Sequence, residues 1–262
     1  MASFLRIGSL NANGIQSHKY EIKAFICLHC LEILLVSETH FNKDHYFKLE
    51  GFAFYHVDHP SERARGGATV IISKQLQHHE VEGFGSPQIQ ACNVNISMEN
   101  KPITISTIYC PPVKKGFKLE PLHFKTFLKS LGPSYIIGGD FHGKNQAWNS
   151  RLLTPRGREM LQVILSEKAF PMAGSQPTYW PTDLNKKPDI LDFLIVKGID
   201  QHYVKVENTL VQCSDHSLTV LNVSTRAFFK TRTEKLGNKT TNFDIFRQEL
   251  EDRLNLKISL KK

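Results

Sequence analysis

Apolar and polar positions alternate in short runs along most of the chain. Apolar runs rich in β-branched residues predict strands over residues 4–12, 33–38, 68–73, 89–98, 102–109, 135–137, 190–196, 203–211 and 217–224. Apolar residues at helical spacing predict helices over 19–31, 120–131 and 156–168. Many short strands with few helices, bounded by Gly, Pro or Asn, are typical of an α/β or α+β sandwich of two sheets with outer helices. The sequence contains no visible internal repeat.

The C-terminal part of the chain has a different character. Residues 226–262 contain ten basic and five acidic residues and include a polar stretch at 231–242. After that stretch, Thr241 and Asp244 predict a helix start, and the helix has an apolar stripe of Phe243, Phe246, Leu250 and Leu254. We predict one domain over residues 1–225, followed at 226–262 by a basic linker with an amphipathic helix. This helix could lead toward a following domain, dock back on the first one or bind a partner.

Composition excludes several classes of protein. With 262 residues, 40% of them apolar and 22% charged, the chain is not collagenous, coiled-coil or wholly disordered. The formal net charge is +8, but more than half of that surplus lies in residues 226–262, so it is weak support for a nucleic-acid partner. No apolar stretch approaches the roughly 20 residues that a bilayer requires, and the first residues lack secretory-signal features. We therefore expect no membrane partner.

Five cysteines are an odd and sparse set, which favours a reducing compartment over a disulfide framework. Cys27 and Cys30 form a C-x-x-C pair, but no second pair follows at zinc spacing. We expect these two thiols to be buried helix residues, with zinc or redox use as the alternative.

Acidic and amide residues recur where predicted strands end, at Asn11, Glu38, Asp140, Asp192 and Asp215-His216. A hard cation such as Mg²⁺ takes oxygen ligands, and Glu38 is the natural one. Phosphodiester hydrolysis also needs a group that orients or ionises water, donors for the charge on the phosphate, and stabilisation of the leaving oxygen. The residue types for these tasks are present at Asp140, Asn11, Tyr109 and His216.

Six short motifs follow one another in a specific order. They are N-A-N-G at 11–14, S-E-T-H at 37–40, I-Y-C-P at 108–111, G-D-F at 139–141, L-D-F at 191–193 and S-D-H-S at 214–217. In this order and spacing, the chain resembles the exonuclease–endonuclease–phosphatase superfamily. It is most similar to the apurinic-type endonuclease domain of non-LTR (LINE-type) retrotransposon polyproteins, particularly the jockey-like group. Further signature positions of that group are matched by Lys144, Trp148, Ser150 and Arg156-Gly157.

The resemblance implies a four-layer α/β sandwich of two packed mixed β-sheets flanked by helices, with residues 1–225 as the endonuclease domain. It implies a Mg²⁺-dependent enzyme, with Mn²⁺ as a substitute, that nicks one strand of double-stranded target DNA. The resulting 3′-hydroxyl would prime reverse transcription by a downstream reverse-transcriptase domain of the same polyprotein. Element RNA would be an indirect partner, and the active protein would be nuclear after synthesis in the cytoplasm.

The resemblance also implies roles for the residues around the metal. Glu38 and Asn11 would hold Mg²⁺, with Asp215 at the ion or beside it. Asp140 would position the attacking water.

A second group of implied roles concerns the phosphate. His216, oriented through its other ring nitrogen by Asp192, would bind the scissile phosphate, and Tyr109 would support the phosphate or the leaving group. General chemistry agrees, because a carboxylate holds an imidazole in one orientation and favours its charged form.

One departure from the family pattern lies close to Asp140, the carboxylate expected to position the water. The chain has His142 where the family places Asn, and it has Asn145 where related retrotransposon enzymes often have His. An amide and an imidazole donate from different distances, and loss of one such donor typically costs about 10²–10³ in rate. We hypothesise that the domain cuts slowly or uses Asn145 as a substitute donor. A DNA-tethering module with weakened cleavage is the alternative.

A second departure concerns the substrate. Apurinic repair enzymes have Trp three residues before the Asp of their Leu-Asp-Tyr motif, whereas this chain has Asp189. A same-fold phosphodiesterase acting on abasic DNA, RNA or a phosphoinositide is therefore the less favoured alternative.

Several residues are expected to contact DNA. Arg63 and Arg65 lie in a glycine-containing segment at 61–67 that we interpret as a flexible loop facing phosphates. Thr178 matches a Pro-Thr element that shapes the DNA surface in the retrotransposon enzymes, although a Thr at this position could simply fill a strand. The complete predicted DNA-binding set is Arg63, Arg65, Lys144, Asn145 and Thr178.

Overall fold

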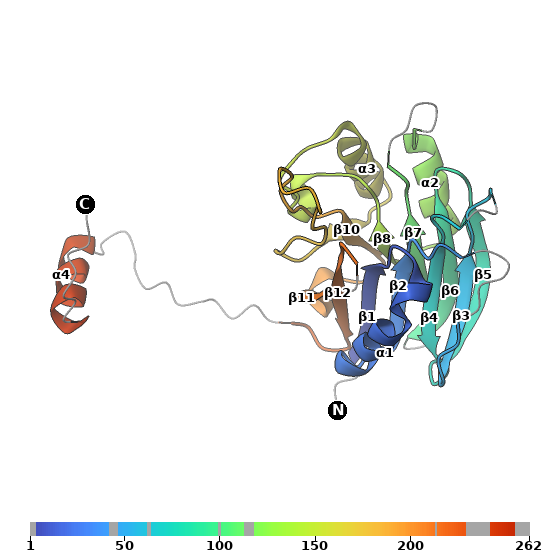
Figure 1. Ribbon diagram of the computed structural model, residues 1–262, viewed down its shortest axis with the longest axis horizontal. Helices are drawn as coiled ribbons and strands as arrows, with labels where there is room; N and C mark the ends of the chain where they lie inside the picture. The colour runs from blue at the N-terminus through green and yellow to red at the C-terminus, as the bar shows by residue number, and fades with distance from the viewer. Residues whose placement is uncertain are drawn as a thin grey trace. The chain divides into compact units, whose positions relative to one another are not determined.

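The computed structural model describes residues 4–41, 47–61, 64–98, 101–112, 118–212, 214–228 and 242–254. The chain divides into two compact units, Met1–Phe228 and Phe229–Lys262. The first unit contains both β-sheets (Figure 1). The described part of the second unit is Asn242 and helix α4 (Phe243–Leu254), a helix that the sequence predicts. A following domain after this helix stays a prediction.

Two mixed sheets of six strands each form the body of the first unit. The first sheet has the order β11 (Val204–Gln212), β12 (Ser217–Ser224), β1 (Phe4–Asn11), β2 (Ile33–Ser37), β4 (Ala68–Ser73), β3 (Phe52–Val57). The second has the order β5 (His78–Gly85), β6 (Gln90–Met98), β7 (Lys101–Tyr109), β8 (Tyr135–Asp140), β10 (Asp192–Lys197), β9 (Phe170–Met172). In each sheet the central pair, β1 with β2 and β7 with β8, is parallel, and the outer pairs are antiparallel.

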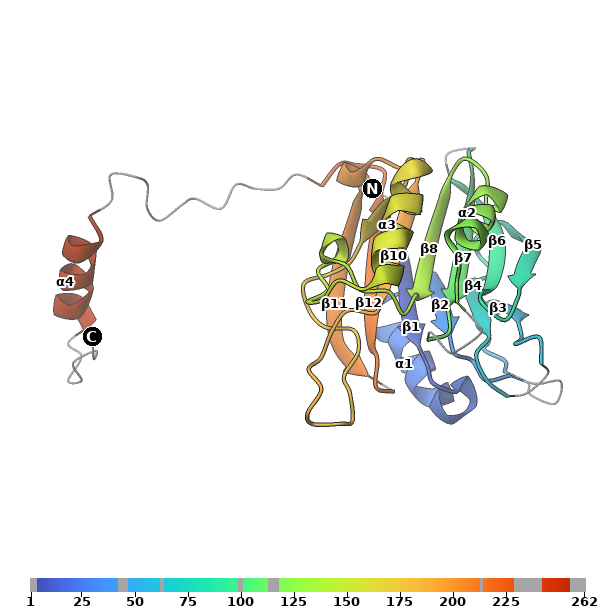
Figure 2. The same cartoon turned by 90° about the horizontal axis from the view of Figure 1, so that it is seen from above.

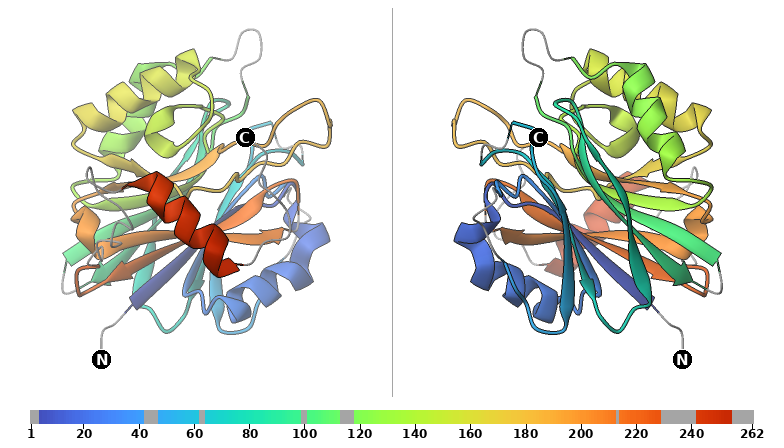
Figure 3. Two further views of the ribbon diagram at one scale, coloured as in Figure 1. Left: turned by 90° about the vertical axis from the view of Figure 1, so that its left-hand side faces the viewer. Right: turned by 90° about the vertical axis from the view of Figure 1, so that its right-hand side faces the viewer.

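Helices cover the outer faces of the two sheets, as Figures 2 and 3 show. Helix α1 (Lys19–Leu28) packs on the first sheet, because Ile22 and Phe25 are buried with Leu34 of β2. Helices α2 (Pro121–Ser130) and α3 (Pro155–Ser166) pack on the second sheet. A further apolar cluster fills the space between the sheets. This four-layer α/β sandwich confirms the fold class that the sequence resemblance implies.

Three strands were not expected from the sequence, namely β3, β5 and β9. Each is an edge strand of its sheet. Their side chains are mostly half-buried or exposed. β5 is mostly polar and β9 has only three residues, whereas β3 has an apolar run, Phe52–Val57, that is missing from the predicted strands. Short 3₁₀ helices complete the described elements, at η1 (Ile15–His18), η2 (Gln146–Trp148) and η3 (Gln201–Tyr203).

The register of the central strands brings their ends together at one rim of the sandwich. Asn11 pairs with Ser37 across β1 and β2, and Asp140 pairs with Tyr109 on one side and with Asp192 on the other. The two sheets approach closely below this rim at Gly138. A Cβ atom there would lie 2.8 Å from Leu35 Cδ1, so the missing side chain allows the sheets to meet.

Cys27 and Cys30 are free and exposed, so the expectation that both thiols are buried is wrong. The buried face of α1 is formed by Ile22, Phe25 and Ile26, and Cys27 lies off that face. The helix ends at Leu28, before Cys30. Within the described ranges, no helix is long and apolar enough to cross a membrane.

Candidate active site

The eight predicted catalytic residues come from both sheets and meet at one rim. The side chains are delivered by the last residues of β1, β7 and β8, the segments that follow β2 and β8, the first residue of β10 and the segment before β12. These residues are Asn11, Glu38, Tyr109, Asp140, His142, Asp192, Asp215 and His216.

Glu38 is the accessible carboxylate of the rim. Its side chain is 17% exposed, and one of its oxygens, Oε2, lies 3.5 Å from Nε2 of His40. Burial favours the neutral acid, but hydrogen bonds from His40, Tyr109 and Asn11 outweigh it and lower the pKa of Glu38. Glu38 is therefore an anion that a solvent-borne cation can reach.

Asp140 is the buried carboxylate of the rim, with 0% exposure. Its Oδ2 accepts a hydrogen bond of 3.0 Å from the Asn11 amide, which also donates to Glu38. Its Oδ1 accepts from the backbone N–H of His142 at 2.9 Å. The same oxygen lies 2.8 Å from Nδ1 of that imidazole, in an ion pair. Burial acts against the charged forms, but the attraction between Asp140 and His142 outweighs it, so the pKa of Asp140 is lowered and that of His142 is raised.

His216 forms a buried pair with Asp192. Nδ1 of the imidazole lies 2.6 Å from Oδ2 of the carboxylate, and both side chains are at most 5% exposed. Burial alone would lower the pKa of His216, but the charge and hydrogen bond of Asp192 raise it to about 9. The rim therefore contains an imidazolium at neutral pH. The ring of Tyr179 packs beside it, with the centroids 5.0 Å apart.

Ser214 connects this pair to the first sheet. Its hydroxyl donates to the backbone carbonyl of Asn11 at 2.7 Å and accepts from the backbone N–H of His216 at 3.1 Å. Asp215 is half-buried and close enough to His216 for its charge to contribute to the raised imidazole pKa. Ser214 lies within a sequence motif, but its role depends on a contact between residues 203 positions apart, which a pattern does not reveal.

Backbone strain is concentrated at the same rim. Asn13, Glu38, His40 and His142 have φ angles of +44°, +51°, +52° and +46°. For residues with a Cβ atom this left-handed conformation costs about 1–3 kcal/mol each when the surroundings impose it. The fold thus supports conformations that direct these side chains toward one another.

Two residues predicted to contact DNA are buried and hydrogen-bonded within the domain. Thr178 is 1% exposed, and its Oγ1 accepts hydrogen bonds of 3.0 Å from the backbone N–H groups of Leu191 and Asp192. Asn145 is 7% exposed and caps η2, with its amide donating to the carbonyl of Gly157. Direct DNA contact by these side chains stays a prediction. The backbone partners of Asn145 also argue against a role as substitute donor.

Lys144, also expected at DNA, is paired within the protein. Its Nζ lies 3.0 Å from Oδ2 of Asp189, which is 1% exposed. The other oxygen of Asp189 accepts from the Ser150 hydroxyl and the Arg151 backbone, both at 2.9 Å. Burial opposes ionisation, but these donors lower the pKa of Asp189. Asp189 therefore holds the 144–151 segment in place and neutralises the lysine.

The segment expected to be a flexible loop is partly packed. Arg63 lies outside the described residues, and Arg65 is exposed. Gly66 and Gly67 are buried, with φ angles of +58° and +85°. A Cβ atom on Gly66 would lie 3.2 Å from Cε1 of Tyr109, so this glycine lets the segment pack against the catalytic rim.

The residues of the rim fit a hard divalent cation. Glu38 presents carboxylate oxygens to solvent. The Asn11 amide oxygen accepts a hydrogen bond of 3.0 Å from the backbone N–H of Asn13 and has a second lone pair for a cation. Asp140, Asp192 and His216 could also each offer a ligand atom, within 4.8 Å of one another. The 2.6 Å bond between His216 and Asp192 engages that pair with itself, which favours Glu38 and Asn11 as the ligands.

The fold of the chain is the fold of apurinic-type endonuclease structures. The endonuclease domain of TRAS1, a telomere-specific non-LTR retrotransposon, superposes with a TM-score of 0.69 at 17% identity, covering 87% of this chain and 100% of that one. The AP endonuclease LMAP from Leishmania major superposes with a TM-score of 0.68 at 14% identity, covering 84% of this chain and 87% of that one.

Sequence comparisons add a more specific similarity, to proteins of retrotransposons. A family model described as endonuclease-reverse transcriptase matches residues 103–220. The probable RNA-directed DNA polymerase from transposon X-element of Drosophila melanogaster is 28% identical over 98% of this chain and 28% of its own length. The RNA-directed DNA polymerase from mobile element jockey of the same species is 28% identical over 94% of this chain and 27% of its own. The chain thus spans little more than a quarter of these relatives, and it resembles the apurinic-type endonuclease domains of non-LTR retrotransposons.

Proposed function

We propose that this domain is a Mg²⁺-dependent endonuclease that nicks one strand of target DNA and leaves a 3′-hydroxyl, from which reverse transcription is primed. The observation that carries the proposal is the Asn11 amide, which joins an accessible carboxylate, Glu38, to a buried one, Asp140. The His216 imidazolium at the same rim adds the positive charge that a phosphate requires.

Each side chain has a task in this reaction. Glu38 and Asn11 would hold Mg²⁺, which when bound supplies positive charge to the phosphate oxygens and the leaving oxygen. Asp140 would orient a water molecule and accept its proton as the water attacks the phosphorus. His216, held by Asp192, would donate a hydrogen bond to a phosphate oxygen as negative charge develops there.

Tyr109 and Asp215 complete the proposed site. The Tyr109 hydroxyl bonds to Glu38, and burial with the nearby Glu38 charge raises its pKa, so it stays a neutral donor beside the leaving group. Asp215 would lie at the edge of the metal site. Mn²⁺ could replace Mg²⁺, because both prefer oxygen ligands.

The relatives support a proposal about the polypeptide and the partners of this domain. They are RNA-directed DNA polymerases, of which this chain spans little more than a quarter. We propose double-stranded DNA as the direct partner, a downstream reverse-transcriptase domain in the same polypeptide, and element RNA as an indirect partner. Access to chromosomal DNA would make the active protein nuclear.

Supercoiled plasmid provides the test. With Mg²⁺, the domain should produce open circles, and Glu38→Ala should not. The nick should be extendable by an added DNA polymerase without prior phosphatase treatment, because the proposed product is a 3′-hydroxyl. Open circles that form equally with Glu38→Ala, or nicks that need a phosphatase before extension, would contradict the proposal.

A DNA-tethering module is the second candidate, and the ion pair between His142 and Asp140 favours it. The His142 imidazole against the carboxylate lowers the pKa of Asp140, and this weakens Asp140 as a base. If the domain is a tether, it should shift plasmid DNA in a mobility-shift assay, and no nicking that depends on Glu38 should be seen.

A further inference from the structure

Two thiols that the proposed active site does not use lie at the C-terminal end of helix α1. Cys27 is in the last turn of the helix, Cys30 follows it, and both are free and exposed. By contrast, Cys92 and Cys110 are buried, and burial raises the pKa of each of these thiols to about 12. Among the described cysteines, the pair at α1 is therefore the one that a reagent from solvent can reach.

The turn that ends α1 brings these two thiols together. The backbone N–H of Cys30 donates to the carbonyl of Cys27 at 3.2 Å and closes a turn over residues 27–30. Residues joined in this way have Cα atoms less than about 7 Å apart, and disulfides span about 4.4–6.8 Å. The Cys30 side chain is directed back over the turn, because its Sγ lies 3.8 Å from the same carbonyl oxygen. The backbone therefore has the spacing that a disulfide requires.

The same turn holds Cys30 in a conformation that is unfavourable for any residue with a side chain. The N–H of Leu31 donates to the carbonyl of Ile26 at 2.9 Å, and with the bond from Cys30 to Cys27 this forms a Schellman motif. Cys30 occupies the left-handed position of the motif, with a φ angle of +47°. Glycine is the usual residue there, because a Cβ atom crowds the backbone. The chain thus has a thiol where glycine would make the reduced domain more stable.

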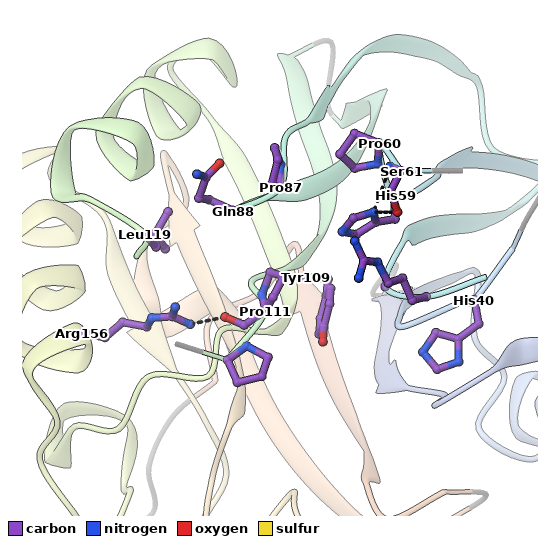
Figure 4. Close-up of a pocket in the computed structure, with 13 residues that line it drawn as sticks. His40, His59, Pro60, Ser61, Pro87, Gln88, Tyr109, Pro111, Leu119 and Arg156 are labelled. Carbon is purple, nitrogen blue, oxygen red and sulfur yellow. Dashed lines mark hydrogen bonds between the residues drawn. The ribbon is translucent and has the colours of Figure 1, made fainter. Parts of the chain in front are cut away.

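The thiol pair is separate from the catalytic rim. Strand β2 begins at Ile33, shortly after Cys30, whereas Glu38 follows the other end of that strand. Neither thiol is among the residues that line the pocket beside the rim, which Figure 4 shows. A covalent change at the pair therefore leaves the groups proposed for nicking in place.

A disulfide suits this pair better than a zinc ion does. Structural zinc sites take four protein ligands. In the part of the chain that the structure describes, the one group of three or more His, Cys, Asp or Glu ligand atoms within 4.8 Å of one another lies at the rim and contains neither thiol. Within the described residues, the pair therefore lacks the further ligands that zinc needs.

We propose that Cys27 and Cys30 are a modification site, at which a low-molecular-weight disulfide such as glutathione disulfide converts the two thiols to an intramolecular disulfide. One protein thiolate attacks the reagent, forms a mixed disulfide and releases a glutathione thiolate. The second protein thiolate attacks the protein sulfur of the mixed disulfide and releases the other glutathione thiolate. The two protons lost by the protein thiols protonate these leaving groups, so the protein pair is oxidised and the reagent is reduced. Excess glutathione reverses both steps.

Thermal unfolding tests the strained turn. Cys30→Gly removes the Cβ atom, and Cys30→Ala, the matched control, keeps it. Under reducing conditions Cys30→Gly should unfold at a higher temperature than Cys30→Ala, because glycine adopts the left-handed conformation without crowding. Equal unfolding temperatures would overturn the strained geometry on which the assignment rests.

Glutathione buffers test the disulfide on the full chain. Residues 24–43 form one tryptic peptide that contains Cys27, Cys30 and no other cysteine, so mass spectrometry after alkylation distinguishes a dithiol, an internal disulfide and a mixed disulfide. In about 1 mM glutathione disulfide, the internal disulfide should exceed the mixed disulfide about tenfold or more, because a thiol held this close has an effective concentration of about 10 mM or more. Cys27→Ser and Cys30→Ser should each give the mixed disulfide alone.

Three results would overturn the inference, whatever the nicking assays show. One is as much mixed disulfide on the unsubstituted chain as on Cys27→Ser and Cys30→Ser. Another is a pair that stays fully alkylated in excess glutathione disulfide. The third is a disulfide that joins two chains, seen as a dimer on a non-reducing gel.

Discussion

The two sheets of the domain share one pattern of strand directions but give their carboxylates different environments. The parallel pair β1–β2 delivers Asn11 and Glu38, and the parallel pair β7–β8 delivers Tyr109 and Asp140. The Glu38 side chain is 17% exposed, whereas Asp140 is fully buried. The same pattern of strand directions thus provides one open and one buried carboxylate, which in the proposed reaction would bind a cation and accept a proton.

The resemblance between the halves extends to the following residues. Each carboxylate is followed two positions later by a histidine with left-handed φ, His40 after Glu38 and His142 after Asp140. The nitrogen–oxygen distance is 3.5 Å in the first pair and 2.8 Å in the second. The closer contact belongs to the buried acid, which has no solvent to stabilise its charge.

The largest effect is expected from removing either carboxylate. Glu38→Gln and Asp140→Asn should each lower single-turnover nicking by about 10³-fold or more, because one loses metal binding and the other loses the proton acceptor. The two variants should differ in their response to Mg²⁺. Raising the Mg²⁺ concentration should partly restore Glu38→Gln and leave Asp140→Asn unchanged, as measured by Mg²⁺ titrations of the nicking rate. Identical titrations would contradict the division of labour between the halves.

Asp192→Asn should give the next largest effect, through His216. Because the pKa of His216 is raised to about 9, the imidazole loses its charge as the pH rises through 9. The stability that the charged imidazole adds to the folded domain is complete below about pH 6.5, the pKa in the unfolded chain, and is lost over the same rise. In Asp192→Asn the imidazole should lose its charge at lower pH, with a loss of about 10²-fold in nicking at pH 8. A pH–rate profile measures the shift. A basic limb that stays near 9 in the variant would show that another group controls it.

His142→Asn tests the closer of the two histidine contacts. Releasing Asp140 from the imidazolium should raise its proton affinity, so nicking should become about tenfold faster. His40→Asn, in the more open half, should change the rate by less. Single-turnover rates of the two variants, with thermal unfolding to confirm intact folds, give the comparison. The hypothesis of weakened cutting fails if His142→Asn leaves the rate unchanged.

The smallest effects concern DNA affinity. Arg65, on the side of the first sheet, is exposed, whereas Lys144, near the second, is paired with Asp189. Arg65→Ala should weaken binding by up to about tenfold and reduce its salt dependence, and Lys144→Ala should change it by less than about twofold. Fluorescence anisotropy at several salt concentrations measures both. A larger effect of Lys144→Ala would mean that DNA displaces Asp189.

Much of this arrangement was predictable from the sequence, because buried strands leave apolar runs and strand ends leave short polar motifs. The edge strands β5 and β9 were not, since β5 is mostly polar and β9 has only three residues, and β3 was missed although Phe52–Val57 is an apolar run. The burial of individual polar side chains could not be predicted either. Thr178 and Asn145 have polar side chains that suit a surface, but both are hydrogen-bonded to backbone groups of other segments. The pairing of Lys144 with Asp189 similarly depends on a contact across 45 positions that no local pattern encodes.

The repeat in topology was hidden for a related reason. The two halves share strand directions and a carboxylate followed by histidine, but their other residues are adapted to different neighbours. Strand direction is a property of the assembled sheets, and a sequence comparison of one half with the other does not detect it.

The pairing of β1 with β12 has a consequence for how the protein is made. Phe4 of β1 lies opposite Ser224 of β12, so the centre of the first sheet is incomplete until β12 has been synthesised. The catalytic rim likewise needs both Asn11 and His216. During synthesis, the rim proposed for nicking is therefore incomplete until nearly the whole domain has emerged, and many long-range pairings favour slow folding. A chain that terminates before Asp215 would lack His216 and β12, and with them one side of the rim.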